Sequence, residues 1–485
     1  MSIYLGIDFG TSTNYIVRWD NKNKKIIEEQ FGEHGESNVV SNIIYYKNNE
    51  RVIGTLAEKM GNLDDLNLVK YIKREIDKDN WTTYIPALKR HMKSKEIATD
   101  IFRKIKDKVE FNHGGENIEG AVISVPFAFL YKERQKIKSA ARDAGINVIG
   151  LIEEPVAAAI RCLDYKDELI SNENKNILVF DLGGGTLDVT LFSCKKENKN
   201  INIEVLNTDG NKQLGGKDIT DTLVEYFLKC TNLDISSIND INLRNDILNK
   251  LEKEADNAKK EVSDYGDYNV YCNIDDSELD FDMDDEKLEK ILKLKGFINE
   301  IIITIENAVY DAQLDFEDVD EVVLVGGSSK LKIIKKITKE LFSKDAIEFE
   351  NPDRLVGEGA ALYCGNLLND SFKYNITYRL SQSIGIEKRG KFIELIPKNS
   401  KYGQKSKIDW VSIGKKDEVE IDVYQGNTSD IKICSKIGKV YIKGCNLDKV
   451  GIEFVLNREG IIQYNIYTED DNLNLKLIKE GELSE

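Results

Sequence analysis

The sequence predicts an α/β fold followed by an all-β module, and three observations indicate this. Apolar, strand-like runs alternate with helical patterns through about residue 368, which is the order typical of α/β architecture. From about residue 370, short strands with period-two alternation follow one another, separated by turns. A hairpin pattern near the N-terminus recurs far downstream. The 485 residues are enough for two to four domains, each with its own core.

The repeated hairpin is the most informative motif. Residues 4–19 and 177–192 each contain an apolar strand, an aspartate at its end, a short turn and a second strand. Glycine lets backbone N–H groups approach a phosphate closely, and successive N–H groups form an anion-binding nest. Asp8 and Asp181 can hold a divalent cation, and we expect them to act through waters because Mg²⁺ dehydrates reluctantly. Two such hairpins would hold one polyphosphate and its metal ion from opposite sides. The turn residues are Gly10, Thr11, Ser12, Thr13, Gly183, Gly184, Gly185 and Thr186.

Further elements follow in order along the α/β region. Ser94 is the expected N-cap of a helix over 95–110, and Gly145 is expected to end a helix over 131–144. The other elements predicted before the second hairpin are strands over 39–46 and 120–125 and a helical stretch ending near 71–76.

A third glycine element follows the second hairpin. A buried strand over 321–325 leads into Gly326, Gly327 and Ser328, and then into a basic helix over 330–342. The N–H groups at a helix N-terminus favour anionic or polar groups, so this turn is a candidate for contact with a nucleotide. The helices predicted before it cover 218–230, 245–263 and 284–311.

The last part of the chain is predicted to be a β-sandwich. Its alternating segments are separated by turns, and no helical segment follows them. The expected strands cover 392–396, 419–424, 431–434, 439–442, 452–456, 461–467 and 473–477.

Composition excludes several classes of function. The formal net charge of -17 argues against nucleic acid as a partner, because phosphate backbones need a basic face. No apolar run is long enough to span a membrane and no signal peptide is visible, so we expect no membrane association. The seven cysteines form no C-x-x-C pair, which favours a reducing, cytoplasmic environment. The only histidines, at 34, 91 and 113, lie in polar contexts, so we expect no histidine-based catalytic triad or metal cluster.

These segments together resemble the ATPase domain shared by actin, sugar kinases and the seventy-kilodalton heat-shock chaperones of the DnaK type. The details favour the chaperones, and the resemblance covers nearly the whole chain. The matching segments are 122–135, 152–159, 214–218, 322–330 and 351–361 in the ATPase region, and 383–387 and 457–462 in the tail.

The resemblance implies a specific domain organisation. A two-lobed, actin-like nucleotide-binding domain would cover residues 1–370, a linker 371–382, and a substrate-binding-like β-sandwich without a helical lid 383–485. It also implies ATP or ADP with Mg²⁺, and K⁺, as cofactors. Implied partners are unfolded or extended polypeptide clients, co-chaperones and a nucleotide-exchange factor.

Carried over by position, the resemblance also assigns roles to individual residues. Lys73 would orient the attacking water, with Lys70 as the alternative. Glu154 would assist the metal ion and the water, joining Asp8 and Asp181 as a metal-side carboxylate, and Thr186 would bind the γ-phosphate. The remaining nucleotide-contacting positions are Gly215, Gly216, Asp256, Lys259, Lys260, Ser263, Gly326, Gly327, Ser328, Lys330 and Asp353.

The resemblance also assigns a relay role to residues outside the nucleotide site. At several other positions the sequence departs from the family. Pro126 and Arg134 would relay the nucleotide state toward the β domain. Glu153 stands where the family has Asn, and Lys217 where it usually has an acid. The linker also lacks the family's leucine run. These changes bear on coupling, client dwell time and co-chaperone binding, and they leave the phosphate loops intact.

Three functions fit these features. The first is an ATP-hydrolysing, lidless chaperone-like protein. The second is a small-molecule kinase of the same superfamily, although no spare acid is positioned for a hydroxyl acceptor and the β tail would be unexplained. The third is a non-hydrolysing nucleotide sensor or assembly protein, for which the linker changes leave room.

Overall fold

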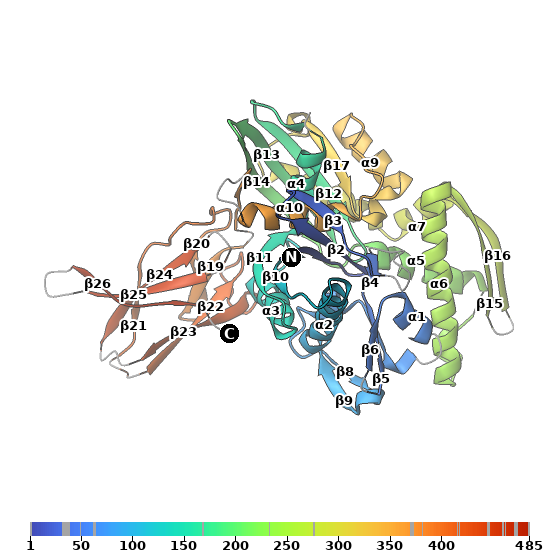
Figure 1. Cartoon of the computed structure of the whole chain (residues 1–485), viewed down its shortest axis with the longest axis horizontal. Coiled ribbons are helices and arrows are strands. Elements are labelled where there is room, and N and C mark those ends of the chain that lie inside the picture. Colours follow the sequence, from blue (N-terminus) through green and yellow to red (C-terminus); the bar gives the residue numbers. More distant parts are fainter. Residues whose placement is uncertain are drawn as a thin grey trace.

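A computed structural model shows two α/β lobes and a β-sandwich projecting to one side (Figure 1). Residues of both lobes, among them Ser12 and Lys259, line a cleft between the lobes. The structure describes residues 2–31, 39–48, 50–61, 65–166, 169–231, 233–274, 277–368, 373–380, 382–414, 416, 418–443, 447–457, 460, 462–469 and 474–483.

The first lobe is built on a sheet of order β11-β10-β1-β2-β3, with β4 pairing to β2. Strand β1 runs antiparallel to β2, the other arm of the first hairpin, and parallel to β10. Helices α2 (Ser94–Asn112) and α3 (Tyr131–Asp143) bury apolar side chains against one face of this sheet. The strands are β1 (Ile3–Phe9), β2 (Thr13–Asp20), β3 (Lys25–Glu28), β4 (Val39–Ser41), β10 (Ile118–Val125) and β11 (Val148–Glu153).

The second lobe repeats this plan in a sheet of order β17-β12-β13-β14-β18. Strand β12 pairs antiparallel with β13, the other arm of the second hairpin, and parallel with β17. Helices α4 (Glu154–Tyr165) and α10 (Leu355–Leu367) pack against each other between the two sheets. The strands are β12 (Lys175–Leu182), β13 (Leu187–Glu197), β14 (Asn200–Asn211), β17 (Glu321–Val325) and β18 (Tyr374–Thr377).

Smaller elements form the outer walls of the cleft. In the first lobe these are β5 (Ile43–Lys47), β6 (Glu50–Ile53), α1 (Thr55–Gly61), β7 (Leu68–Lys70), the 3-10 helix η2 (Ile72–Glu75), β8 (Thr82–Ile85) and β9 (Arg90–Lys93). In the second lobe they are α5 (Gly216–Thr231), α6 (Ile241–Tyr265), β15 (Asp267–Ile274), β16 (Ser277–Asp284), α7 (Asp285–Leu294), α8 (Phe297–Tyr310), the 3-10 helix η7 (Gly327–Lys330) and α9 (Lys332–Phe342).

Each lobe has its own hydrophobic core. Ile7 of β1 and Phe102 of α2 belong to the first core, whereas Phe180 of β12 and Phe227 of α5 belong to the second. A third cluster, including Ala157 and Ala360, fills the space between the two sheets. The outer parts of the two lobes do not share a core, and polar contacts such as those of Tyr71 with Glu252 and of Arg74 with Asp218 join them across the cleft.

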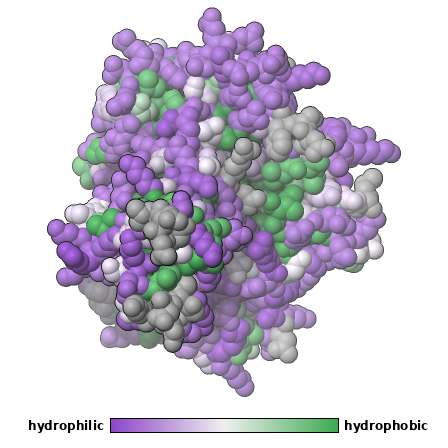
Figure 2. Space-filling view, turned by 90° about the vertical axis from the view of Figure 1, so that its left-hand side faces the viewer, coloured by the Kyte–Doolittle hydropathy of each residue, from purple (hydrophilic) through white to green (hydrophobic). Residues whose placement is uncertain are grey.

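The sandwich packs two antiparallel sheets, of order β20-β19-β22-β23 and β21-β24-β25-β26, around a core that includes Val423 and Phe454. Tyr131 of α3 joins this core, and its hydroxyl donates to the Leu483 carbonyl at 3.1 Å. Figure 2 looks onto the sandwich side of the molecule, where hydrophilic residues surround smaller apolar areas. The strands are β19 (Ile384–Lys388), β20 (Lys391–Ile396), β21 (Asp409–Ser412), β22 (Glu418–Gln425), β23 (Ser435–Lys443), β24 (Lys449–Leu456), β25 (Ile462–Glu469) and β26 (Leu475–Glu482).

Residues 374–377, within the predicted linker, form β18, which pairs with β14 at the edge of the second-lobe sheet. Arg379 and Lys401 both pair with Glu204 of β14, at 2.5 and 2.9 Å. Residues 371, 372 and 381 of that linker, together with His34 and Cys445, lie outside the described residues. Among the helices that the structure describes, none has the length and apolar character needed to cross a membrane.

Two predicted helices were wrong in extent. The helix over 284–311 is two helices, because Gly296 adopts φ +77° and ends the first one. The helical stretch ending near 71–76 is instead a strand, β7, followed by the single turn η2.

Three local predictions also need correction. Ser94 is the first helical residue rather than the N-cap, and Glu96 accepts a hydrogen bond from the backbone N–H of Lys93 at 2.9 Å. Residues 431–434 form a turn in which the Lys432 N–H donates to the Asp430 carboxylate at 3.0 Å, although their alternation imitates a strand. The final strand begins at residue 475 and continues to 482.

Candidate functional site

The turns of the two repeated hairpins lie against each other at the base of the cleft. A Cβ atom added to Gly184 would collide with Ser12, and one added to Gly185 would lie 2.5 Å from Thr11. Only glycine therefore allows this close approach. The two predicted anion-binding turns thus face one space from opposite lobes.

Backbone contacts hold the other glycine turns against the second hairpin. The Gly216 N–H donates to the Gly183 carbonyl at 2.9 Å, and the Ser328 hydroxyl donates to the same carbonyl at 3.1 Å. A Cβ atom on Gly215 would lie 2.6 Å from the Gly185 backbone. Gly326 has φ +81°, which turns the chain from β17 into η7. The structure therefore brings together the three glycine elements that the sequence separates.

Buried carboxylates surround this point. Asp8 is the second-last residue of β1 and accepts a hydrogen bond from the Ser124 hydroxyl at 2.8 Å. Burial, and then the charge of Glu154, raises the pKa of Asp8 to about 7. Burial, with the charges of Glu154, Asp188 and Asp8, raises the pKa of Asp181 well above its usual range. The charge of Lys73 lowers both pKa values and so offsets part of this effect, and a further cation bound here would stabilise the ionised carboxylates.

A hydrated magnesium ion fits this donor set. Among the residues that the structure describes, no three histidine, cysteine or acidic side chains converge closely enough to ligate a metal ion directly. The charge of Glu154 nonetheless raises the pKa of both Asp8 and Asp181, so the three carboxylates lie within electrostatic range of one another. They suit an ion held through its own waters, which is how Mg²⁺ is commonly bound beside phosphates.

The two candidate lysines point in different directions. Lys73 forms a buried ion pair with Glu154, and its side chain is only 4% exposed. Lys70 instead lies 3.9 Å from Glu252 on α6, at the outer side of the cleft. Lys73 also lines a cavity of about 240 Å³ together with Thr11 and Thr186, whereas Lys70 does not.

A larger cavity, of about 420 Å³, opens beside the turns and collects most of the other predicted positions. Its predicted lining residues are Ser12, Thr13, Gly184, Gly216, Asp256, Lys259, Lys260, Ser263, Gly327, Ser328, Lys330 and Asp353. The predicted residues that line neither this nor the smaller cavity are Asp8, Gly10, Glu154, Asp181, Gly183, Gly185, Gly215 and Gly326. These residues instead lie within the glycine turns or directly behind them.

Helix α6 supplies the polar wall of the larger cavity. Lys259 Nζ contacts Asp256 at 2.6 Å and donates to the Gly216 carbonyl at 3.0 Å, which ties α6 to the glycine turn. Burial lowers the pKa of Lys259. The Ser263 hydroxyl is buried with no hydrogen-bond partner among the described residues. An unpaired buried hydroxyl facing a cavity suits a ligand that carries polar edges.

Sequence reasoning missed Asp188. It lies directly opposite Asp181 in the second hairpin, and it is buried. Burial, and then Glu154, raises its pKa to about 7. The hairpin register carries a signal for it, since a four-residue turn from Gly183 to Thr186 sets Asp188 across from Asp181.

Arg74 was also missed. Its guanidinium donates to the Asp218 carboxylate at 2.5 and 3.2 Å and to the Gly185 carbonyl at 2.6 Å. Asp218 in turn accepts from the Gly215 N–H at 2.8 Å. Nothing in the sequence marks this contact, because its partners lie more than a hundred positions away.

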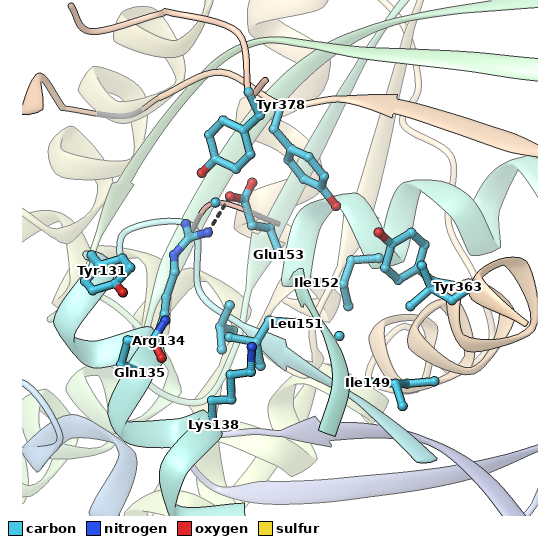
Figure 3. Close-up of a pocket in the computed structure, with 15 residues that line it drawn as sticks. Tyr131, Arg134, Gln135, Lys138, Ile149, Leu151, Ile152, Glu153, Tyr363 and Tyr378 are labelled. Carbon is cyan, nitrogen blue, oxygen red and sulfur yellow. Dashed lines mark hydrogen bonds and ion pairs between the residues drawn. The ribbon is translucent and has the colours of Figure 1, made fainter. Parts of the chain in front are cut away.

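The predicted relay residue Arg134 lies at the junction with the sandwich. It pairs with Glu153 at 2.8 Å and donates to the Phe129 carbonyl at 2.7 Å. Figure 3 shows this pair beneath Tyr378, in a small cavity that Tyr402 also lines. Burial raises the pKa of Glu153, although Arg134 opposes the shift.

The fold and the paired hairpins define a two-lobed nucleotide-binding protein with an attached β-sandwich. The family model described as Hsp70 protein matches residues 76–479, so the chain belongs to the Hsp70 family. This confirms the predicted resemblance and, with it, an actin-like ATPase fold followed by a β-sandwich. Members of the family are ATPases that bind ATP or ADP with Mg²⁺ and act as chaperones on unfolded polypeptides.

Similar curated proteins point the same way. The chain is 29% identical over 499 aligned residues to the chaperone protein dnaK of Guillardia theta, covering 95% of this chain and 76% of that protein. The proteins of the same name from Cyanidium caldarium and Cyanophora paradoxa are also 29% identical, and the matches cover 78% and 77% of their lengths.

Proposed function

We propose that this protein binds ATP, hydrolyses it slowly, and binds extended apolar polypeptide segments in a nucleotide-dependent way. The observation that best supports this proposal is that the two glycine turns face one shared space. Beside it lie the Lys73–Glu154 pair and the buried aspartates. Polyphosphate recognition needs this combination of backbone N–H groups, a cation site and a positioned lysine.

Lys73 would orient the attacking water toward the γ-phosphate, with Glu154 fixing the lysine's position through their ion pair. Thr186 lines the same cavity as Lys73, which supports a contact between its hydroxyl and that phosphate. Asp8, Asp181 and Glu154 would hold Mg²⁺ through waters. When bound, Mg²⁺ neutralises charge that develops on the phosphates. Asp188, coupled to the same carboxylates, adds to the negative charge that attracts the ion.

The larger cavity would take the nucleoside. Asp256, Lys259, Lys260 and Ser263 on α6 face Gly327, Ser328 and Lys330 of η7 across it. The unpaired Ser263 hydroxyl supports a hydrogen bond to the nucleoside. ATP and ADP with Mg²⁺, and by family resemblance K⁺, are the proposed cofactors.

The proposed division is an ATPase domain to residue 370, a linker over 371–382 and a substrate-binding sandwich from 383. Arg134, at the junction with the sandwich, would carry the nucleotide state across it, with Pro126. Polypeptide clients, co-chaperones and an exchange factor are the proposed partners. The cysteine pattern supports a cytoplasmic location.

An ATPase assay on the full chain tests this function. We expect slow release of phosphate that requires Mg²⁺ and stops with a chelator, and a change in rate when unfolded peptide is added. Nucleotide binding without any hydrolysis would favour a sensor or assembly role. Phosphate transfer to an added sugar or acid would indicate a kinase, and an absence of ATP binding would contradict the proposal.

Gly185→Ala provides a test of the paired turns. Its Cβ would enter the space of Thr11, so the turns must separate, and we expect ATP affinity to fall by about tenfold or more through overpacking. Gly183→Ala is the matched control, since its Cβ meets only the Thr186 carbonyl at 3.8 Å. Titration with a fluorescent ATP analogue measures both. Equal affinities for the two variants would show that the close approach is not needed.

Peptide binding is tested on the full chain with labelled hydrophobic heptapeptides. We expect saturable binding, because main-chain pairing with a strand gives affinity and pockets for alternate side chains give specificity. The exposed apolar residues Ile433, Leu475 and Leu477 show that the sandwich surface is not wholly polar. An absence of binding in both the ATP and ADP states would count against a chaperone role.

A further inference from the structure

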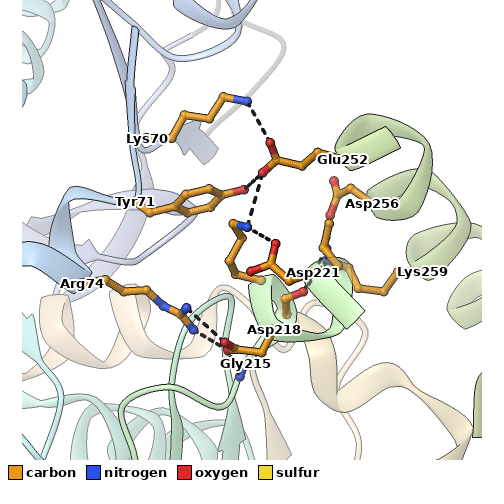
Figure 4. A network of polar contacts seen from close by, with 12 residues as sticks. Lys70, Tyr71, Arg74, Gly215, Asp218, Asp221, Glu252, Asp256 and Lys259 are labelled. Carbon is orange, nitrogen blue, oxygen red and sulfur yellow. Dashed lines mark hydrogen bonds and ion pairs between the residues drawn. The ribbon is translucent and has the colours of Figure 1, made fainter. Parts of the chain in front are cut away.

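A short segment of the first lobe reaches across the mouth of the nucleotide cavity. It runs from Lys70 at the end of β7 to Arg74 in η2, and it contacts α5 and α6 of the second lobe (Figure 4). Lys73 of this segment points inward to Glu154, whereas Lys70 and Tyr71 point outward to α6. The outward contacts are not needed for the proposed chemistry.

Glu252 of α6 is the shared acceptor of these outward contacts. The Tyr71 hydroxyl donates to its carboxylate at 3.2 Å. The ammonium groups of Lys217 and Lys70 lie 3.7 and 3.9 Å from the same carboxylate. Lys217 also lies over the Tyr71 ring, 5.3 Å from its centroid, which adds a cation–π attraction. Three side chains from two lobes therefore meet on one acid.

Tyr71 adopts a backbone conformation that a tyrosine rarely takes. Its φ and ψ are 58° and 30°, in the left-handed region, which is unfavourable for a non-glycine residue. This conformation directs the ring toward Glu252 across the cleft. Burial, and then the charge of Glu252, raises the pKa of Tyr71, so the hydroxyl stays protonated and can donate.

These contacts lie at the edge of the cavity, where they can affect a bound ligand. Lys70 and Tyr71 line the 420 Å³ cavity together with Asp256 and Lys259, so they border the space that the nucleotide would occupy. Next to Tyr71, Ile72 belongs to the first lobe's core, and next to Glu252, Leu251 belongs to the second lobe's core. At this point the contacts between the two lobes are polar, and they can break without disrupting the packing of either core.

We propose that Tyr71, Lys217 and Glu252 form a latch across the cavity mouth that sets how long a bound nucleotide stays. The inference rests on the proposed nucleotide-binding function and adds residues that control release. The Glu252 and Lys217 side chains are 25% and 18% exposed, so the latch is partly shielded from water. Hydrogen bonds to a charged group contribute more than neutral ones, so we expect loss of the Tyr71 hydroxyl to speed release by about threefold to tenfold.

Stopped-flow release of fluorescent ADP from the full-length protein tests the latch. Tyr71→Phe removes only the hydroxyl and keeps the ring beneath Lys217. Glu252→Ala removes the shared acceptor and should speed release at least as much. In the double variant, Tyr71→Phe should add nothing further, because its partner is already absent. Tyr84→Phe is the control and should release ADP at the wild-type rate, because Tyr84 is an exposed residue of the same lobe whose ring packs at a tilt against His91.

The possible results distinguish the latch from the proposed nucleotide-binding function. A wild-type release rate in Tyr71→Phe, or single effects that multiply in the double variant, would overturn the latch while leaving nucleotide binding intact. Failure of the wild-type protein to bind fluorescent ADP would overturn the proposed function and the latch together. Melting temperatures of all variants identify any effect that comes from a loss of folding.

Discussion

Lys73→Ala is expected to abolish ATP turnover while leaving most ATP binding intact. A residue that orients the attacking water acts mainly in the transition state, so its loss lowers the rate of hydrolysis more than the affinity. Groups that act on the reacting water contribute a factor of about 100 to 10,000. Single-turnover hydrolysis together with equilibrium titration of ATP separates these two quantities.

The ion pairs of Lys73 and Lys70 indicate which variants serve as matched controls. Removing Lys73 leaves Glu154 buried without its partner, and this lowers the free energy of unfolding as well. Lys73→Arg keeps a positive charge against Glu154, so it should restore most of the stability without restoring hydrolysis. Lys70→Ala should keep the hydrolysis step, because Lys70 points to Glu252. An active Lys73→Ala together with an inactive Lys70→Ala would move the catalytic role by three positions. Activity in both would contradict a catalytic role for this segment.

Asp8→Asn and Asp181→Asn are each expected to reduce Mg²⁺-dependent hydrolysis by about a hundredfold or more, since charge stabilisation by a metal ion contributes several kcal/mol. Asp181 is buried and Asp8 is partly buried, and burial and then the charge of Glu154 raise the pKa of both carboxylates. The same substitutions should therefore raise the melting temperature of the Mg²⁺-free protein. Function and stability would then change in opposite directions.

Two measurements check this pair of effects. Hydrolysis is followed across a Mg²⁺ titration, and thermal unfolding is followed with a chelator present. Ser124→Ala is the control, because it removes the hydrogen bond to Asp8 without removing a charge. Its effect on hydrolysis should be smaller than that of Asp8→Asn. An Asn variant with normal Mg²⁺ dependence would contradict the metal role of that aspartate.

The sequence by itself determined the fold class and located the glycine turns that are proposed to bind phosphate. The pattern of strand, aspartate and glycine-rich turn occurs twice in the sequence, so Gly184 and Gly185 could be recognised as turn residues without any knowledge of their neighbours. Only the tertiary structure shows that these two positions exclude a side chain, because they approach Ser12 and Thr11 of the other lobe. Their order among the other motifs then indicated the family, which the family match confirmed. Strand and helix periodicity located most elements, because burial on one face imposes a regular spacing.

The tertiary structure alone decided which side chains meet. Lys70 and Lys73 are equivalent as letters, and only the αL backbone at Tyr71 and the short turn η2 send one to Glu252 and the other to Glu154. The hairpin register shows that Asp188 lies opposite Asp181. Arg74 and Glu252 find partners more than a hundred positions away, across a cleft between two separate cores. Periodicity reports burial on a local face, whereas a polar contact across a cleft depends on how two lobes are oriented, which no local pattern encodes.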